Sequence, residues 1–121
     1  MIPDPDAVAR AYATIAPELG LSDRASEAAI RVALREADVL SNDIYDVPGS
    51  LLYSLGRQSR CFAGFRAMSV LVVEWHTKTL GFKLEASRPE LAAVLTRVAL
   101  REMTHEEVAA WMTDRMLPFG G

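Results

Sequence analysis

The sequence is poor in the residues that would assign it to several large classes of protein. It contains one cysteine, Cys61, so neither an intrachain disulfide nor a metal site of several cysteines can form. Its 13 basic residues are set against 16 acidic ones, without the basic stripe that binds a nucleic-acid backbone. The longest largely apolar run, Ala67–Val73, stops at Glu74 and is far too short to span a membrane.

The N-terminus and the overall composition indicate an ordinary folded protein. The first residues, MIPDPDAVAR, lack the positive start and the apolar core of a signal peptide. Half of the residues are apolar (50%) and 24% are charged, which is typical of a globular domain. We therefore expect one cytoplasmic domain, residues 1–121, that binds neither nucleic acid nor membrane.

The spacing of apolar residues predicts helices along nearly the whole chain. We expect a first helix over about Asp6–Ala16 and a second one that Ser22 or Asp23 caps. The second helix should turn one apolar stripe inward, made of Ala29, Val32, Ala33, Ala37 and Leu40.

The middle of the chain contains the least regular segment and the most apolar one. The segment SNDIYDVPGS is rich in turn-forming residues, and a third helix should follow it over about Ser50–Gln58. A fourth helix should start near Gly64. Because it is apolar almost all round, we expect it to be the central, buried helix.

Two capping boxes mark the starts of the last two helices. Ser87–Glu90, with Pro89 in the first turn, should open a helix that runs to about Glu102. Thr104–Glu107 should open another that runs to about Met116. TLGFKLEAS reads as a short connection with one or two extended residues. The predicted fold class is all-α, with about six helices around the fourth.

The segment Leu51–Met112 has a distinctive order of elements. It comprises a helix, a loop, a long apolar helix ending at Gly81–Phe82, and two capped helices. In this order, and from about Leu19 to Met116, the chain resembles the Doc (death-on-curing) branch of the Fic/Doc family. These proteins are best known as bacterial toxins of toxin–antitoxin pairs. The resemblance implies a Fic/Doc-like helical bundle.

The catalytic loop of that family reads His, any residue, Phe, any residue, Asp or Glu, Gly, Asn, Lys or Gly, Arg. Counting back from Gly81 sets the corresponding positions at Ser59, Cys61, Ala63, Gly64, Phe65, Arg66 and Ala67. Only the glycine is kept, and Arg66 stands at the lysine. A second register pairs Arg60 with the histidine and Phe62 with the aromatic residue. Neither register restores a histidine or an acid, so the loop is degenerate.

The resemblance implies which chemistry the loop has lost. In the family the histidine deprotonates the target hydroxyl, the acid holds Mg²⁺, and the loop grips nucleotide phosphates. Ser59 cannot act as a base near neutral pH and Ala63 cannot bind a metal. We therefore expect phosphoryl or nucleotidyl transfer to be lost, and we expect neither a metal site nor a resident cofactor.

An anion site at this loop is the function that the retained residues could still support. Gly64 and Phe65 lie where helix amides point at a ligand, and Arg60 and Arg66 would pair with a phosphate, a nucleotide or a carboxylate. The alternative is solvated surface charge beside a turn. Ser59 and Cys61 are the candidate catalytic residues, although a small buried cysteine is the more common case.

The two histidines and the C-terminal apolar residues allow structural explanations as well. His76 ends a buried helix and His105 should be exposed, and neither has a second histidine at ligand spacing. The family resemblance implies a groove for an antitoxin-like helix or another protein partner. Core packing is the alternative for the apolar side chains that could line it: Trp111, Met112, Met116 and Phe119.

Three functions remain open from the sequence. The first is a degenerate Doc-like protein of a toxin–antitoxin system that binds a protein partner or an anionic ligand. The second is an enzyme that has reused the pocket for other small-molecule chemistry, as in specialised biosynthesis. The third is a still-active nucleotide-dependent transferase toxin with a substituted base, against which the missing histidine, acid and final arginine count heavily.

Overall fold

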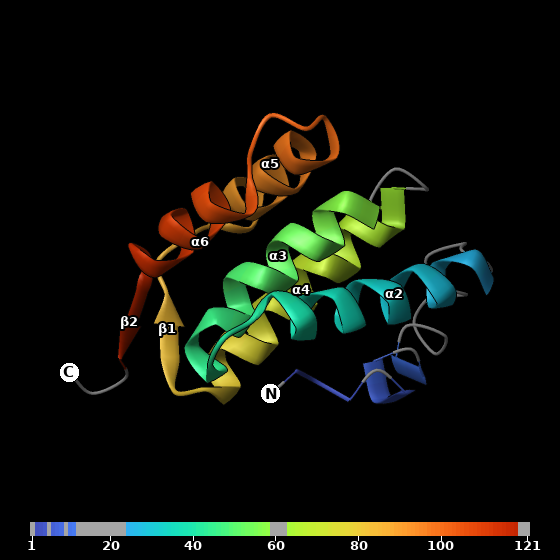
Figure 1. Cartoon of the computed structure of the whole chain (residues 1–121), viewed down its shortest axis with the longest axis horizontal. Helices are drawn as coiled ribbons and strands as arrows, with labels where there is room; N and C mark the ends of the chain where they lie inside the picture. Colours follow the sequence, from blue (N-terminus) through green and yellow to red (C-terminus); the bar gives the residue numbers. More distant parts are fainter. Residues whose placement is uncertain (1, 5, 9, 12–23, 59–62, 119–121) are drawn as a thin grey trace.

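A computed structural model of the chain describes residues 2–4, 6–8, 10–11, 24–58 and 63–118, with the backbone alone for 24–27 and 63–65. This part is mostly helical, which confirms the predicted class. Residues 6–8 and 10–11 are helical, as expected for the first helix. The further elements are α2 (Arg24–Leu40), the short 3₁₀ helix η2 (Ile44–Asp46), α3 (Val47–Gln58), α4 (Ala63–Thr79), β1 (Phe82–Leu84), α5 (Arg88–Ala99), α6 (His105–Thr113) and β2 (Met116–Pro118) (Figure 1).

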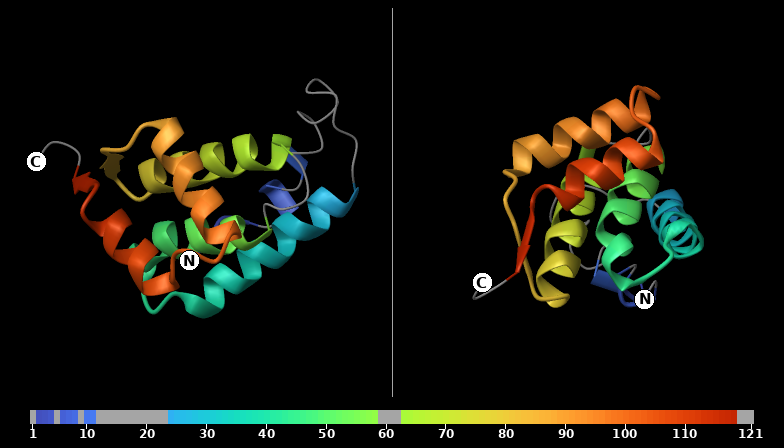
Figure 2. Two further views of the ribbon diagram at one scale, coloured as in Figure 1. Left: turned by 90° about the horizontal axis from the view of Figure 1, so that it is seen from above. Right: turned by 60° about the vertical axis from the view of Figure 1, so that its left-hand side comes forward.

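The central helix is α3, and the prediction that the fourth helix holds this place is wrong. Helix α3 contacts α2, α4, α5 and α6, and most of its residues are buried. Figure 2 shows it flanked by α2 and α4, with α5 and α6 packed over another side. By contrast, α4 leaves Leu71 40% and Trp75 56% exposed. Apolar composition alone does not show which helix the other helices can approach most closely.

Small residues explain why α3 can be surrounded. A Cβ placed on Gly56 would lie 2.8 Å from Cβ of Val98. The backbone of α3 at Gly56 therefore packs directly against the Val98 side chain of α5. A Cβ on Gly49 would lie 3.2 Å from the Cα of Ala109 in α6. Close contact of this kind excludes cavities and maximises dispersion contacts between the helices. The glycines therefore set the distances of α5 and α6 from α3.

Helix α3 begins three residues earlier than predicted because η2 leads directly into it. Asp43 caps η2: its side chain accepts from the amides of Tyr45 and Asp46, and Asp46 returns a bond to the Asp43 amide. Pro48 then lies in the first turn of α3, where a missing N–H costs nothing. The turn-rich segment thus forms a capped 3₁₀ helix that continues directly into α3.

The inward face of α2 is centred elsewhere than predicted. Ala29, Ala33 and Ala37 are buried as expected, but Val32 is 48% exposed and Leu40 is only half-buried. The larger core side chains are Ile30 and Leu34. At about 100° per residue, Val32 lies roughly opposite Ile30 on the helix. The prediction was therefore right for the three alanines, but it included Val32 and missed the two largest core side chains of the face.

Both predicted capping boxes are confirmed. Ser87 caps α5 with Pro89 in its first turn, and Thr104 caps α6. Both helices end earlier than predicted. Helix α5 stops at Ala99 and α6 at Thr113, because the following residues form a left-handed turn and strand β2 respectively. β2 pairs antiparallel with β1, with Lys83 opposite Leu117.

Candidate functional site

The residues predicted to form a site are only partly described. Ser59, Arg60 and Cys61 lie outside the described residues. Gly64 and Phe65 are in the first turn of α4, one residue from the expected helix start. Arg66 follows them with an exposed side chain, and it makes no ion pair with a described residue. The predicted anion site therefore stays a prediction.

Arg66 borders an apolar groove between α4 and the first half of α5. The groove has a volume of about 410 Å³ and is walled mainly by Ala67, Val70, Leu71, Pro89 and Ala92. Arg88 lies on its other side and is held by Glu74, whose Oε1 is 3.0 Å from the arginine Nε. The structure thus places Arg66 beside apolar surface, with a second arginine nearby.

A second apolar groove lies on the other side of Leu71. It has a volume of about 310 Å³ and runs between α4 and the N-terminal helical residues, with Ala7, Val8, Ala11, Met68, Leu71 and Trp75 among its walls. Val8 is buried in the core, and Asp6 pairs with Arg31 of α2, so this wall is anchored. Leu71 lines both grooves. We call Ala67, Leu71, Trp75 and the two grooves the α4 face.

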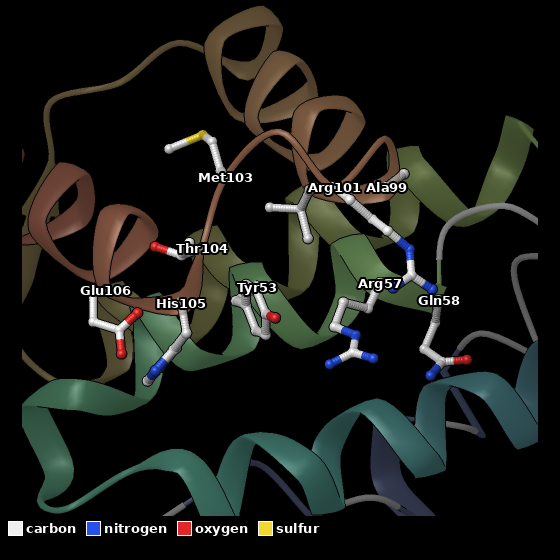
Figure 3. Close-up of a pocket in the computed structure, with 10 residues that line it drawn as sticks. Tyr53, Arg57, Gln58, Ala99, Arg101, Met103, Thr104, His105 and Glu106 are labelled. Carbon is white, nitrogen blue, oxygen red and sulfur yellow. The ribbon is translucent and has the colours of Figure 1, made fainter.

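A third pocket in the described part of the chain lies on different elements. It has a volume of about 540 Å³ and is bounded by the second half of α3 and by the connection from α5 to α6. Figure 3 shows Arg57, Gln58 and Arg101 at one end, His105 and Glu106 at the other, and Tyr53 between them. We call this the α3/α5–α6 pocket. The pocket was not predictable from local sequence patterns, because its two sides lie 40 or more residues apart in the chain.

His105 was expected to be exposed and is instead half-buried. Its Nε2 lies 3.1 Å from Oγ of Ser50, a buried residue of α3, and its ring packs on Tyr53 at a centroid distance of 5.3 Å. Because the Ser50 hydroxyl is buried in the helix interface, it cannot reach a substrate. The pair fixes the position of the imidazole in the pocket wall.

His76 is buried at the end of α4, with 5% of its surface exposed. Its Nε2 has no hydrogen-bond partner among the described residues. Burial disfavours the charged ring and lowers the pKa of His76 below its ordinary value. This burial agrees with the interpretation of His76 as part of the end of a buried helix.

The C-terminal apolar residues belong mainly to the fold. Met112 is fully buried, and Met116 is half-buried in β2. Trp111 is half-buried beneath Arg115, whose Cζ lies 4.2 Å from the ring centroid. Phe119 lies outside the described residues. Core packing therefore accounts for Trp111 and Met112.

The described residues contain no group of three or more His, Cys, Asp or Glu side chains that could hold a metal ion. None of their helices is both long enough and apolar enough to cross a membrane.

The fold and the sites define a mostly helical protein with an exposed apolar helix face and a separate polar pocket. Neither the protein-family models nor the curated proteins include a match to this chain. The α4 face and the α3/α5–α6 pocket are the two surfaces that bear on function.

Proposed function

We propose that this is a degenerate Doc-like protein of a toxin–antitoxin type system, which acts by binding a helix of a partner protein on the α4 face. The observation that carries the proposal is the exposure of Leu71 and Trp75, one helical turn apart, where Leu71 lines both apolar grooves and Trp75 lines the second. Large apolar side chains grouped this way on a surface mark interaction sites more often than single exposed ones do.

The spacing of the face suits an amphipathic helix. Ala67, Leu71 and Trp75 follow each other at every fourth residue and form a ridge along α4, in which Ala67 borders the first groove, Trp75 borders the second and Leu71 borders both. A partner helix with apolar residues at every third or fourth position could fill one groove and pack on the ridge. Tryptophan is also enriched among the residues that dominate binding energies.

The charges beside the face favour an acidic partner. Arg66 is exposed at the edge of the groove and is unpaired with any described residue. A carboxylate on the partner helix would find a bidentate donor there. The resemblance to proteins whose antitoxin helix lies in a groove adds support for a helical protein as the occupant. A second copy of this chain is the competing occupant.

Binding can be tested with the full chain and a designed helical peptide of about 18 residues, carrying leucine at every third or fourth position and flanking glutamates. Calorimetry should give saturable binding, and Leu71→Ala and Trp75→Ala should each weaken it at least about tenfold. Val39→Ala is the matched control, because Val39 is 84% exposed on α2. Equal binding by all variants, or self-association through Leu71 in place of peptide binding, would contradict the proposal.

The loss of transfer activity needs a separate test. Ser59 and Ala63 stand where the resembled family has its base and its metal ligand. Purified protein incubated with ATP, Mg²⁺ and a translation factor should therefore leave the factor unmodified, as judged by mass spectrometry. Modification that Ser59→Ala leaves intact and Arg66→Ala abolishes would show an active transferase with a substituted base.

A further inference from the structure

We propose that the α3/α5–α6 pocket binds a small organic oxyanion, a carboxylate or phosphate carried on a flat apolar body, with Arg57 and Arg101 as the anion clamp. This site shares no residue with the α4 face and is independent of the function proposed above.

The charge of the pocket supports this ligand class. Two arginines and one glutamate line it, while the whole chain has a net charge of −3. Arg57 and Arg101 come from different elements and reach the same end of the pocket, whereas Glu106 lies at the other end (Figure 3). Two guanidinium groups that converge from separate elements can hold a carboxylate or phosphate by several charge-assisted hydrogen bonds.

Arg101 is the residue whose backbone calls for an explanation. Its φ is +62°, a left-handed conformation that glycine usually adopts at the end of a helix. The turn is held by two bonds, from the Arg101 amide to the Val98 carbonyl (2.9 Å) and from the Glu102 amide to the Arg97 carbonyl (2.8 Å). An arginine here stores strain of the kind found at binding sites. Its side chain makes no ion pair with a described residue.

Arg57 is positioned by its neighbours. Its Nη1 lies 3.4 Å from Oε1 of Glu36, and its Cζ lies 5.8 Å from the ring centroid of Tyr53. The contact with Glu36 holds the guanidinium near the pocket and also competes with a ligand for it. An anion that displaces this long contact would gain a shorter charge-assisted bond.

The middle of the pocket suits a flat apolar group. The rings of Tyr53 and His105 form one wall, and Ser50 fixes the imidazole from behind. Val98 and Met103 are both buried and supply apolar surface to the same pocket. A volume of about 540 Å³ lies within the range of small-molecule sites. The walls are therefore formed before a ligand arrives.

The test uses the full chain with four probes: phenyl phosphate, phenylacetate, inorganic phosphate and benzyl alcohol. We expect saturable amide shifts at residues 57–58 and 101–105 with phenyl phosphate or phenylacetate, and the stronger of these two identifies the anion. Inorganic phosphate and benzyl alcohol should each bind at least about tenfold more weakly. Absence of saturable shifts with both organic anions overturns the proposal, and equally tight inorganic phosphate overturns the apolar half of it.

Variants separate binding from folding. Arg101→Gly should abolish binding while raising Tm, because glycine relieves the left-handed strain. Arg101→Lys should retain part of the affinity. Glu36→Gln should tighten binding by releasing Arg57, and Lys78→Ala is the matched control on the exposed end of α4. Unchanged affinity in Arg101→Gly would overturn the proposal.

Arg66→Ala should weaken binding of the helical peptide to the α4 face and leave binding of the organic anions unchanged. Either proposal can therefore fail without the other.

Discussion

The Oγ of Ser50 lies 3.1 Å from Nε2 of His105 and joins the first half of α3 to the first turn of α6. Both residues are at least half-buried, so the bond is shielded from solvent. It fixes α6 against α3 at the point where the α3/α5–α6 pocket begins. This one contact thus links the core helix α3 to the start of α6 and to the wall of the pocket.

Breaking this contact should cost a measurable part of the stability. We expect Ser50→Ala to lower the free energy of unfolding by about 1 kcal/mol, since a net buried hydrogen bond is worth about that much. Urea unfolding of Ser50→Ala, His105→Phe and the double variant measures the coupling between the two side chains. A coupling energy near zero would show that the bond contributes nothing to the fold.

Gly56→Ala should destabilise the packing of α3 on α5. The added Cβ would lie 2.8 Å from Val98, which is closer than side chains tolerate. Overpacking of this kind costs about 1–3 kcal/mol, against a gain of up to about 1 kcal/mol in helix propensity. Thermal unfolding should therefore show a net loss.

The control for this prediction is the variant Val98→Gly, which removes both atoms that the new methyl group would meet at 2.8 Å, Cβ and Cγ1 of Val98. Measured against Val98→Gly alone, Gly56→Ala should lose most of its penalty. A penalty that persists in the Val98→Gly background would mean that the contact with Val98 is not its cause.

Ser54→Ala should raise the stability. Ser54 is fully buried in α3, and its Oγ has no hydrogen-bond partner among the described residues. A buried hydroxyl without a partner costs about 1–3 kcal/mol relative to a well-solvated one, and alanine is also the better helix former. We expect a higher urea midpoint with an unchanged m-value. A lower midpoint would show that the hydroxyl makes a stabilising contact.

His76 should make the stability fall in mildly acidic solution. Burial lowers its pKa in the folded protein below the ordinary 6.5, so the unfolded chain takes up the proton first as the pH drops. The free energy of unfolding is unaffected by His76 above about pH 6.5. It declines below that pH and levels off below the pKa of His76 in the folded protein.

Unfolding curves between neutral and acidic pH check this for two variants. His76→Leu should lose the decline in this window, because the titrating group is gone. His105→Gln, which keeps His76, should retain it. If the His76→Leu profile matches that of the unaltered chain, the decline has another origin.

The parts of the fold that the sequence predicted depend on residues close together in the chain. A capping box needs only a side chain and an amide three residues apart, so the starts of α5 and α6 were correct at Ser87 and Thr104. The central position of α3 depends on contacts with α5 and α6, which follow far along the chain. Composition pointed to α4 because it does not record how closely Gly49 and Gly56 let other helices approach.

The candidate surfaces were predictable to a smaller extent. Arg66 was singled out for its place at the head of α4, and the structure shows it beside apolar surface. The exposure of Leu71 and Trp75 was not predictable, because an apolar residue in an apolar helix is expected to lie in the core. Arg101 gave no local signal, since a non-glycine residue with positive φ is visible only in the folded chain.

The most direct test of the proposed function is an amide-shift titration of the full chain with the helical peptide. We expect saturable shifts over residues 66–75 of α4, with residues 101–105 unaffected, and loss of those shifts in Trp75→Ala. Shifts confined to the α3/α5–α6 pocket, or none on α4 at saturating peptide, would contradict the account.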